Sequence, residues 1–374
     1  MRVLVAVDSF KGSIGAPAVA AAIGAGWSSV RPGDTVDLLP LADGGEGTAE
    51  VIAAATAGAV VHEVAAVTGP DGRKVTGEWV ELPGGVAVVD LAQMSGLPLM
   101  RELDPRGATT RGLGEVVRAA VESGMSEVWI GLGGSASTDG GVGALRALGM
   151  RALDARGCEV PDGGIGLREL DAVDLSGLLP IPGGVRLLTD VTSPLTGAAG
   201  AAAVFGPQKG ADPVQVRILD RALARLADVL GADLGVDAET AGAGAAGGTA
   251  FGFAAVYGAA IVPGADEVAR LTRLDERIAL ADLVITGEGA FDAQSRRGKL
   301  VGNVLTRAAT AGKATAVIAG VLREDPGVPA VGLVELAGSS EAALRFPARW
   351  ARAAGARLAS TSAGSRSGRG MPPR

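Results

Sequence analysis

Five segments of the sequence combine small residues with side chains that can bind ions or move protons. They are Asp8-Ser-Phe-Lys-Gly-Ser13, Ala42-Asp-Gly-Gly-Glu-Gly-Thr48, Gly133-Gly-Ser-Ala-Ser-Thr-Asp-Gly-Gly141, Asp190-Val-Thr-Ser-Pro-Leu-Thr-Gly197 and Gly287-Glu-Gly-Ala-Phe-Asp-Ala-Gln294. Each follows a short apolar run that is typical of a β-strand. Because ligands of parallel sheets bind beyond the carboxyl ends of the strands, the repetition indicates a ligand site built from several loops.

The glycine-rich loops favour phosphoryl transfer as the chemistry. Glycine turns let main-chain N–H groups face an anion, and a following helix adds positive potential at its amino end. Residues 133–141 have that layout, with a helix expected from about Gly140 and a hydroxyl donor at Thr138. A lysine in a second glycine-flanked loop can add positive charge. The candidates for binding the phosphates of the phosphoryl donor are Gly133, Gly134, Ser135, Ser137 and Lys209.

Acidic residues in the same loops suit Mg²⁺, which takes carboxylate oxygens and substrate phosphates. The acids that we considered for this purpose are Asp43, Glu46, Asp190, Glu288 and Asp292. We assign Asp43 and Glu288 to the metal, Asp190 to activation of the attacking hydroxyl, and Lys11 to the charge on the migrating phosphoryl group. The candidates for binding the acceptor substrate are Ser9, Ser13 and Asp292.

Several of these acids also have a purely structural interpretation. Glu46 suits the first turn of a helix, where a carboxylate is stabilised by the helix dipole. Asp139 suits a helix N-cap, an interpretation that we favour over catalysis. Asp190 is harder to explain structurally, because a carboxylate at the end of an apolar strand is costly unless it is paired or liganded. Asp190 is therefore the stronger functional candidate.

Apolar strands alternate with Ala-rich helical stretches along the chain, which predicts an α/β fold with mostly parallel sheets. The expected strands are residues 3–7, 35–41, 60–67, 86–91, 127–132, 185–189, 282–286 and 315–319. The expected helices are residues 17–30, 46–57, 112–123, 140–148, 213–230, 246–257, 266–278 and 300–311. Pro17 and Pro213 suit first-turn positions, where the missing N–H is not needed.

Residues 68–82 break this rhythm, because a turn is followed there by an alternating, half-exposed strand. An antiparallel excursion at this point suggests entry into a second domain. We therefore expect two different α/β domains, one inserted into the other, with the active site in the cleft between them. One domain is expected from residues 1–70 and 275–360, and the inserted one from residues 71–274. Residues 361–374 are expected to be a disordered tail.

The overall composition excludes several classes of protein. The formal net charge is −7 and no predicted helix face concentrates Lys and Arg, so no nucleic-acid partner is expected. One cysteine and one histidine, His62, rule out intramolecular disulfides and disfavour a zinc site. We interpret His62 as a partly exposed strand residue. With no signal-peptide layout and no membrane-spanning run, we expect a cytoplasmic enzyme whose oligomeric state is open.

Other nucleotide-binding patterns are absent or weak. The sequence has no Gly-x-x-x-x-Gly-Lys-Ser/Thr run and no His-Arg-Asp motif, so it is neither a Walker A protein nor a protein kinase. Gly131-Leu-Gly-Gly-Ser-Ala136 matches a dinucleotide fingerprint weakly, which leaves an NAD-dependent oxidoreductase as the alternative. A non-catalytic regulatory module is a third possibility, but it does not need acids at so many strand ends.

The motifs together resemble the bacterial type I glycerate kinases, over a span from Met1 to about Ser360. The five segments above carry this resemblance, together with Phe205-Gly-Pro-Gln-Lys-Gly-Ala211 and Gly242-Ala-Gly-Ala-Ala-Gly-Gly248. The resemblance implies phosphorylation of D-glycerate with ATP and Mg²⁺, more often to 2-phosphoglycerate. It also implies two different α/β domains.

One position departs from the pattern of that family. Members of the family usually have Arg after Gly-Glu-Gly, whereas this sequence has Ala290 after Gly289. We expect Arg296 or Arg297 to replace the missing side chain if it contacts phosphate, or else a lower affinity.

Overall fold

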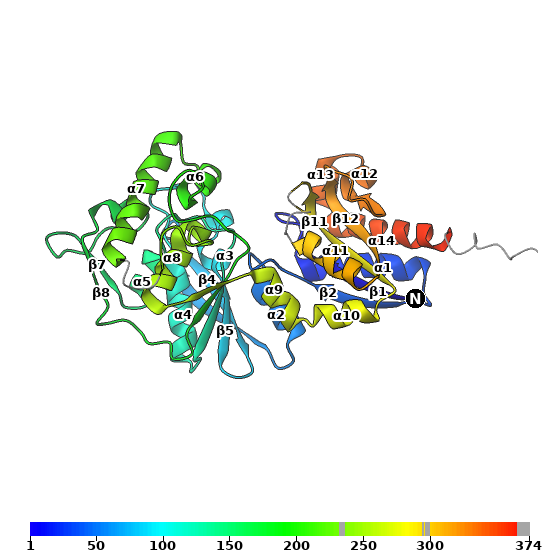
Figure 1. Ribbon diagram of the computed structural model, residues 1–374, viewed down its shortest axis with the longest axis horizontal. Helices are drawn as coiled ribbons and strands as arrows, with labels where there is room; N and C mark the ends of the chain where they lie inside the picture. The colour runs from blue at the N-terminus through cyan, green and yellow to red at the C-terminus, as the bar shows by residue number, and fades with distance from the viewer. Residues whose placement is uncertain (232–235, 294, 296–299, 365–374) are drawn as a thin grey trace, which may run out of the picture. The chain divides into compact units, whose positions relative to one another are not determined.

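The computed structural model describes residues 1–231, 236–293, 295 and 300–364, which divide into two compact units. The terminal unit contains Met1–Asp43 and the described residues from Val268 onward, and the central unit contains the described residues of Gly44–Glu267. Each unit is built on its own sheet with helices beside it (Figure 1). The expected α/β fold with mostly parallel sheets is confirmed.

The terminal unit has a five-stranded, wholly parallel sheet in the order β13-β12-β11-β1-β2. Its strands are β1 (Arg2–Val7), β2 (Thr35–Pro40), β11 (Leu283–Phe291), β12 (Ala314–Leu322) and β13 (Ala330–Gly332). Its helices are α1 (Ala16–Val30), α10 (Leu274–Leu280), α11 (Leu300–Thr310), α12 (Leu333–Ala337), α13 (Ser340–Arg345) and α14 (Pro347–Gly364), and α9 (Gly264–Leu271) spans the boundary between the units.

Helices cover both faces of this sheet, as a parallel sheet requires. Successive residues of β12 point to opposite faces: Ile318 belongs to the core that contains α1 and α14, and Val317 belongs to the core that contains Val301 of α11. Glycine lets α1 and α14 approach closely. A Cβ on Gly26 would lie 1.9 Å from the carbonyl oxygen of Arg352, so a larger residue would force the helices apart.

The central unit has a six-stranded sheet in the order β10-β9-β6-β5-β4-β3. The strands of this sheet are β3 (Val60–Thr68), β4 (Lys74–Leu82), β5 (Val86–Asp90), β6 (Glu127–Gly131), β9 (Val185–Leu188) and β10 (Ala260–Val262), and β7 (Arg151–Leu153) and β8 (Ala172–Asp174) form a separate antiparallel pair. The strands β3, β4 and β5 pair antiparallel, and the remaining pairs of the large sheet are parallel.

The helices of the central unit surround a single large core. They are α2 (Thr48–Ala55), α3 (Leu91–Ser95), α4 (Arg111–Glu122), α5 (Val142–Ala147), α6 (Ala201–Phe205), α7 (Pro213–Leu230) and α8 (Ala245–Tyr257), with 3-10 turns at Leu97–Leu99, Gly166–Glu169 and Pro207–Lys209. Local sequence fixes several of their ends. Pro17 and Pro213 occupy the first turns of α1 and α7 as expected, and Asp212 and Gln215 form a capping box on α7.

Every strand and helix expected from the sequence overlaps an observed element of the same type. Residues 361–364, expected to begin a disordered tail, belong to α14, and the rest of that expected tail lies outside the described residues. Three further details differ. The helix expected at residues 266–278 is two helices, α9 and α10, because the chain adopts a left-handed conformation at Arg273 (φ +55°). The strand expected to end at Thr286 continues as β11 to Phe291.

The third difference concerns the boundary between the two units. The first crossing lies between Asp43 and Gly44 rather than after residue 70. The reason is that β3 pairs with β4 over most of its length, which ties residues 60–68 to the central sheet. The second crossing lies between Glu267 and Val268, close to the expected residue 274. The expected antiparallel excursion is present, but it starts one strand earlier than the sequence suggested.

Candidate functional site

A cavity of about 360 Å³ lies in the terminal unit, beside the carboxyl end of β1 and the second half of β11. Six predicted site residues line it: Ser9, Lys11, Ser13, Asp43, Glu288 and Asp292. The rest of the wall is largely apolar and includes Leu300, Val301, Val321, Leu333, Val334 and Leu344. The cavity therefore has a charged part and an apolar part, and its size suits a ligand larger than a simple ion.

Lys11 and Asp43 form an ion pair at the charged part of the cavity. Lys11 Nζ donates a hydrogen bond of 2.9 Å to Asp43 Oδ2. Partial desolvation opposes the charged form of the lysine, but the carboxylates of Asp43 and Asp8 outweigh this effect and raise the pKa of Lys11. The two residues come from the loops after β1 and β2, which are adjacent strands. The cavity thus holds a permanent cation next to at least one acid.

Asp8 also lines this cavity, although the sequence analysis did not select it. Its carboxyl group lines the cavity, is only 7% exposed and accepts a hydrogen bond from the N–H of Ser9. Burial and the nearby negative charge of Asp43 raise its pKa to about 7, although Lys11 acts in the opposite direction. Asp8 is the first residue after β1, so the strand-end criterion that selected Lys11 and Ser9 applied equally to it.

Glu288 reaches the same cavity from a strand rather than from the predicted turn. It pairs with Ala319 in the parallel ladder between β11 and β12. The glycine before Glu288 allows β11 to pack closely against β12 and does not form a turn. A Cβ on Gly287 would lie only 1.9 Å from the carbonyl oxygen of Ile318 on β12. Glu288 is 9% exposed, so its carboxylate is nearly buried at the cavity wall.

A second, smaller pocket of about 100 Å³ lies in the central unit. Predicted phosphate-binding residues that line it are Gly133, Gly134, Ser135 and Lys209. Lys209 is 2% exposed and donates a 3.0 Å hydrogen bond to Ser135 Oγ and a second one to the carbonyl oxygen of Ser137. Burial lowers the pKa of Lys209 to about 8, and Asp139 partly opposes this shift. The pocket therefore contains a buried cation.

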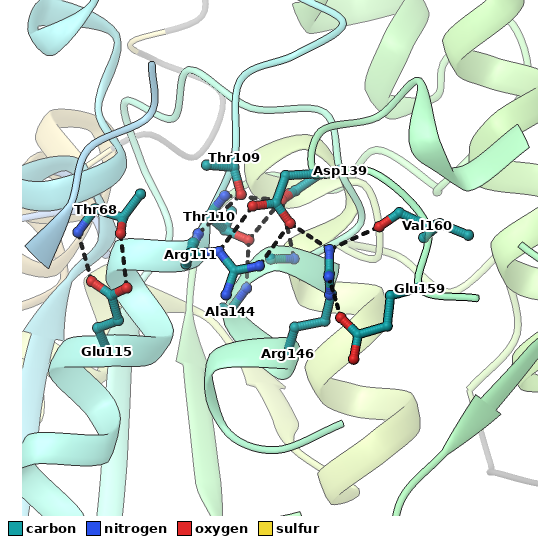
Figure 2. Close-up of polar contacts among 12 residues, drawn as sticks. Thr68, Thr109, Thr110, Arg111, Glu115, Asp139, Ala144, Arg146, Glu159 and Val160 are labelled. Carbon is teal, nitrogen blue, oxygen red and sulfur yellow. Dashed lines mark hydrogen bonds and ion pairs between the residues drawn. The ribbon is translucent and has the colours of Figure 1, made fainter. Parts of the chain in front are cut away.

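The amino end of α5 does not supply the anion site that its loop suggested. The buried carboxylate of Asp139 accepts hydrogen bonds from the N–H groups of Gly141 and Gly143. It also accepts hydrogen bonds from the N–H and the hydroxyl of Thr110 (Figure 2). An acid of the chain itself therefore already occupies this helix end. These hydrogen bonds support a structural role for Asp139. The N-cap residue of α5 is Gly141, however, and not Asp139 as expected.

A second buried acid occupies the amino end of α2. Asp90, at the end of β5, accepts hydrogen bonds from the N–H groups of Gly47 (2.9 Å) and Ala49 (3.1 Å). Burial raises its pKa to about 7, while these two donors favour the charged form. Glu46, the predicted alternative for this helix, lies before the N-cap residue Gly47 and is exposed. The acid that holds this turn thus comes from a neighbouring strand.

Asp190 lies just after β9 and lines neither of the two cavities described above. Its Oδ1 atom accepts a 3.3 Å hydrogen bond from the N–H of Ala265 in the first turn of α9. Its neighbour Val191 does line the pocket of Lys209. Asp190 belongs to the central unit and Lys11 to the terminal unit, so their joint role in catalysis stays a prediction.

His62 has the structural role expected of it. It lies on β3, stacks on Trp79 with ring centroids 4.2 Å apart, and contacts Glu81 at 2.8 Å. Within the described part of the chain, no group of three or more His, Cys, Asp and Glu side chains is arranged to hold a metal ion. None of the described helices is long and apolar enough to cross a membrane.

Comparison with known proteins identifies the family. The model of the glycerate kinase family matches residues 3–362. This chain belongs to the glycerate kinase family. The expectation of a phosphotransferase from this family is thereby confirmed.

Individual relatives in the glycerate kinase family agree with this assignment. The chain is 42% identical over 334 residues to the glycerate 2-kinase of Escherichia coli K12, covering 88% of this chain and 87% of the relative. It is 42% identical over 305 residues to the glycerate kinase of Bacillus subtilis 168, covering 80% and 79%. A crystal structure described as a glycerate kinase 2 from Salmonella typhimurium LT2 aligns with a TM-score of 0.81 at 38% identity, covering 98% of this chain and 99% of that one.

The structure also weakens the NAD-dependent alternative to a glycerate kinase. A dinucleotide fingerprint needs a helix directly after its glycines. Here β6 ends at Gly131 and the next helix, α5, begins only at Val142.

Ala290, which stands where members of the family usually have Arg, lies on β11 at the wall of the larger cavity. Arg296 and Arg297, expected to compensate for it, lie outside the described residues.

Proposed function

We propose that the chain transfers the γ-phosphoryl group of ATP to D-glycerate, with Mg²⁺, and that the product is 2-phosphoglycerate. The choice of the 2-hydroxyl is supported by the E. coli relative, which is named a glycerate 2-kinase. The proposal includes a cytoplasmic location, where ATP is available.

The observation that carries the proposal is the composition of the cavity in the terminal unit. Its charged part contains the Lys11–Asp43 ion pair with Asp8 and Glu288 in the same wall, and its other part is lined by aliphatic side chains. A magnesium nucleotide needs both kinds of surface, because the base is apolar and the phosphates carry metal and negative charge. We therefore propose that Mg–ATP binds in this cavity.

The carboxylates of this cavity fit Mg²⁺. Asp8, Asp43 and Glu288 bring enough negative charge together that the pKa of Asp8 rises, with burial as the larger cause, and a divalent cation would relieve that repulsion. Mg²⁺ commonly takes only one or two carboxylates and completes its shell with phosphates and water, so a pre-formed cluster of three protein ligands is not required. Asp43 and Glu288 remain our choice as ligands. The metal would neutralise charge on the phosphates.

The remaining roles follow from charge and position. Lys11 stabilises negative charge on the migrating phosphoryl group, since it is held at the charged part of the cavity by Asp43. Ser9 and Ser13 can donate hydrogen bonds to phosphate oxygens in the same cavity. Asp190 accepts the proton of the attacking hydroxyl or orients that hydroxyl, which keeps the role assigned to it from the sequence.

An assay of ADP release tests the proposal. Purified protein is incubated with ATP, MgCl₂ and D-glycerate, and ADP is measured against a reaction without glycerate and a reaction with Lys11→Met. We expect ADP to form only in the complete reaction with the wild-type protein. Glycerate-independent ADP, or equal ADP from Lys11→Met, would contradict the proposed function.

A further inference from the structure

We infer that the small pocket around Lys209 in the central unit binds the carboxylate of the acceptor substrate, D-glycerate, instead of the phosphates of the nucleotide. This inference rests on the proposed function and deepens it, because it says which substrate each cavity takes. It reverses the expectation from the sequence about which residues bind which substrate. That expectation gave the phosphates of ATP to Gly133, Gly134, Ser135, Ser137 and Lys209, and the acceptor to Ser9, Ser13 and Asp292.

Lys209 is the first reason. Its ammonium group is nearly fully buried, and among the described residues its hydrogen-bond partners include no carboxylate, although the charge of Asp139 acts on it from farther away. Its hydrogen-bond acceptors are the hydroxyl of Ser135 and the carbonyl of Ser137, which are both uncharged. A buried cation is costly unless a charge compensates it, so the pocket is arranged to receive an anion.

The glycine turn beside Lys209 is the second reason. The main-chain N–H groups of Gly133, Gly134 and Ser135 donate to no acceptor in the part of the chain that the structure describes, and all three residues line the pocket. Gly134 has φ +67°, a conformation that favours glycine. Consecutive unused N–H groups next to a lysine are a suitable site for a carboxylate or a phosphate.

The volume of the pocket favours the carboxylate of glycerate over the phosphates of a nucleotide. The pocket holds about 100 Å³, against about 360 Å³ for the cavity in the terminal unit on the same measure. Pockets for ligands of nucleotide size have volumes of about 300 Å³ or more. Glycerate is a three-carbon acid, so it suits the smaller pocket. The side-chain amide of Gln208, also in the wall, can bond to a hydroxyl of the substrate.

The charged residues in the walls of the two cavities also favour glycerate in the small pocket and the nucleotide in the larger cavity. The wall of the small pocket contains one cation and no acidic residue, whereas the larger cavity contains Asp8, Asp43, Glu288 and Asp292 beside Lys11. A nucleotide brings Mg²⁺ with it and therefore needs carboxylates nearby. A single lysine matches the single negative charge of glycerate. The lowered pKa of Lys209, about 8, still leaves it mostly protonated near neutral pH.

The experiment compares ligands that differ only in the charge to be recognised. Affinities for D-glycerate, its neutral amide glyceramide, and the Mg²⁺ complex of a non-hydrolysable ATP analogue are measured by calorimetry on wild type and Lys209→Met. Lys74→Met is the matched control, since Lys74 is an exposed lysine of the same unit. In the wild type we expect D-glycerate to bind about 10- to 100-fold more tightly than glyceramide.

In Lys209→Met we expect this preference to disappear while the affinity for the nucleotide analogue changes less than about threefold. The ratio of two affinities measured on one sample does not depend on how much of the protein is folded. If Lys209→Met does not fold, Ser135→Asp places a competing carboxylate beside the ammonium, and we expect the same selective loss of glycerate binding. Lys74→Met should behave as wild type.

Two results would overturn the inference. One is loss of nucleotide binding with the glycerate preference retained, which would return the pocket to the phosphates of ATP. The other is an unchanged glycerate preference in Lys209→Met. Failure of the proposed function gives a different result, since the wild-type protein would then release no glycerate-dependent ADP at all.

Discussion

Lys11 Nζ lies 2.9 Å from Asp43 Oδ2. This ion pair joins the loops that follow the adjacent parallel strands β1 and β2. The pair is partly open to solvent, so its contribution to stability is small. The main effect of the ion pair is to position Lys11, because Asp43 holds the ammonium group at the wall of the cavity where Asp8 and Glu288 also lie. A cation and several acids in one wall can bind both the phosphates and the metal of a nucleotide.

Asp43→Asn should therefore impair turnover and metal use together. The amide cannot ligate Mg²⁺ as well as a carboxylate, and it no longer holds Lys11 by charge. We expect kcat to fall about 100-fold or more and the Mg²⁺ concentration for half-maximal rate to rise. Steady-state kinetics across Mg²⁺ concentrations measures both effects. Asp37→Asn is the control, since Asp37 pairs with Arg2 and Arg277 and does not line the cavity. Wild-type Mg²⁺ dependence in Asp43→Asn would remove it from the metal site.

Asp190→Asn distinguishes a base from a metal ligand. If Asp190 activates the hydroxyl, kcat should fall by orders of magnitude and excess Mg²⁺ should not restore it. Rescue by excess Mg²⁺ would show a ligand instead. The side-chain oxygen of asparagine can still accept the hydrogen bond from Ala265, so we expect little change in thermal stability, and the unfolding temperature should be measured alongside the rate. Near-normal turnover would exclude Asp190 from the chemistry.

Gly134→Ala tests the glycine turn against a second position with positive φ. Gly134 (φ +67°) lines the small pocket, whereas Gly84 (φ +96°) lies in the turn between β4 and β5, where an added Cβ would have no neighbouring atom within 4 Å. Both substitutions place alanine in an unfavourable conformation, at a cost of about 1 kcal/mol. We expect only Gly134→Ala to raise KM for D-glycerate, by several-fold, with KM for ATP little changed. Equal effects of the two variants on KM would mean that the turn is structural only.

The pH dependence of glycerate binding should report Lys209. Its pKa in the folded protein, about 8, lies below the ordinary 10.5, so the cation is present below pH 8 and is lost as the pH rises through that value. The carboxylate of glycerate stays charged throughout this range. We expect kcat/KM for D-glycerate to fall above about pH 8, by up to about tenfold per pH unit. Lys209→Met should have a lower value without this fall. A fall of equal slope in the variant would assign the titration to another group.

Local patterns in the sequence predicted several residues that line the larger cavity. Lys11, Asp43 and Glu288 were found because each lies at or near the end of an apolar strand, and they do line one cavity. The turn expected around Glu288 is wrong, since its glycines serve close strand packing between β11 and β12. That contact joins segments that are distant in the sequence. The local sequence does not show whether a glycine forms a turn or allows two strands to pack closely.

The buried acids Asp90 and Asp139 show the limit of sequence analysis more clearly. Asp90 holds the turn before α2, which is 41 residues away from it at Ala49. Asp139 lies close to the helix that it stabilises, but its partner Thr110 is 29 residues away. The domain boundary was misplaced for a similar reason, because the pairing of β3 with β4 rather than any linker composition sets it. Such long-range partners are decided by tertiary structure.

The most direct measurement of the central claim is proton-coupled phosphorus NMR of the reaction product. The protein is incubated with ATP, Mg²⁺ and D-glycerate, and the new phosphomonoester signal is examined. A phosphate on the 2-hydroxyl couples to one carbon-bound proton and gives a doublet, whereas a phosphate on the 3-hydroxyl couples to two and gives a triplet. We predict a doublet that appears together with ADP and requires D-glycerate. A triplet would contradict the 2-phosphoglycerate product, and the absence of any new phosphomonoester would contradict phosphorylation of glycerate by this chain.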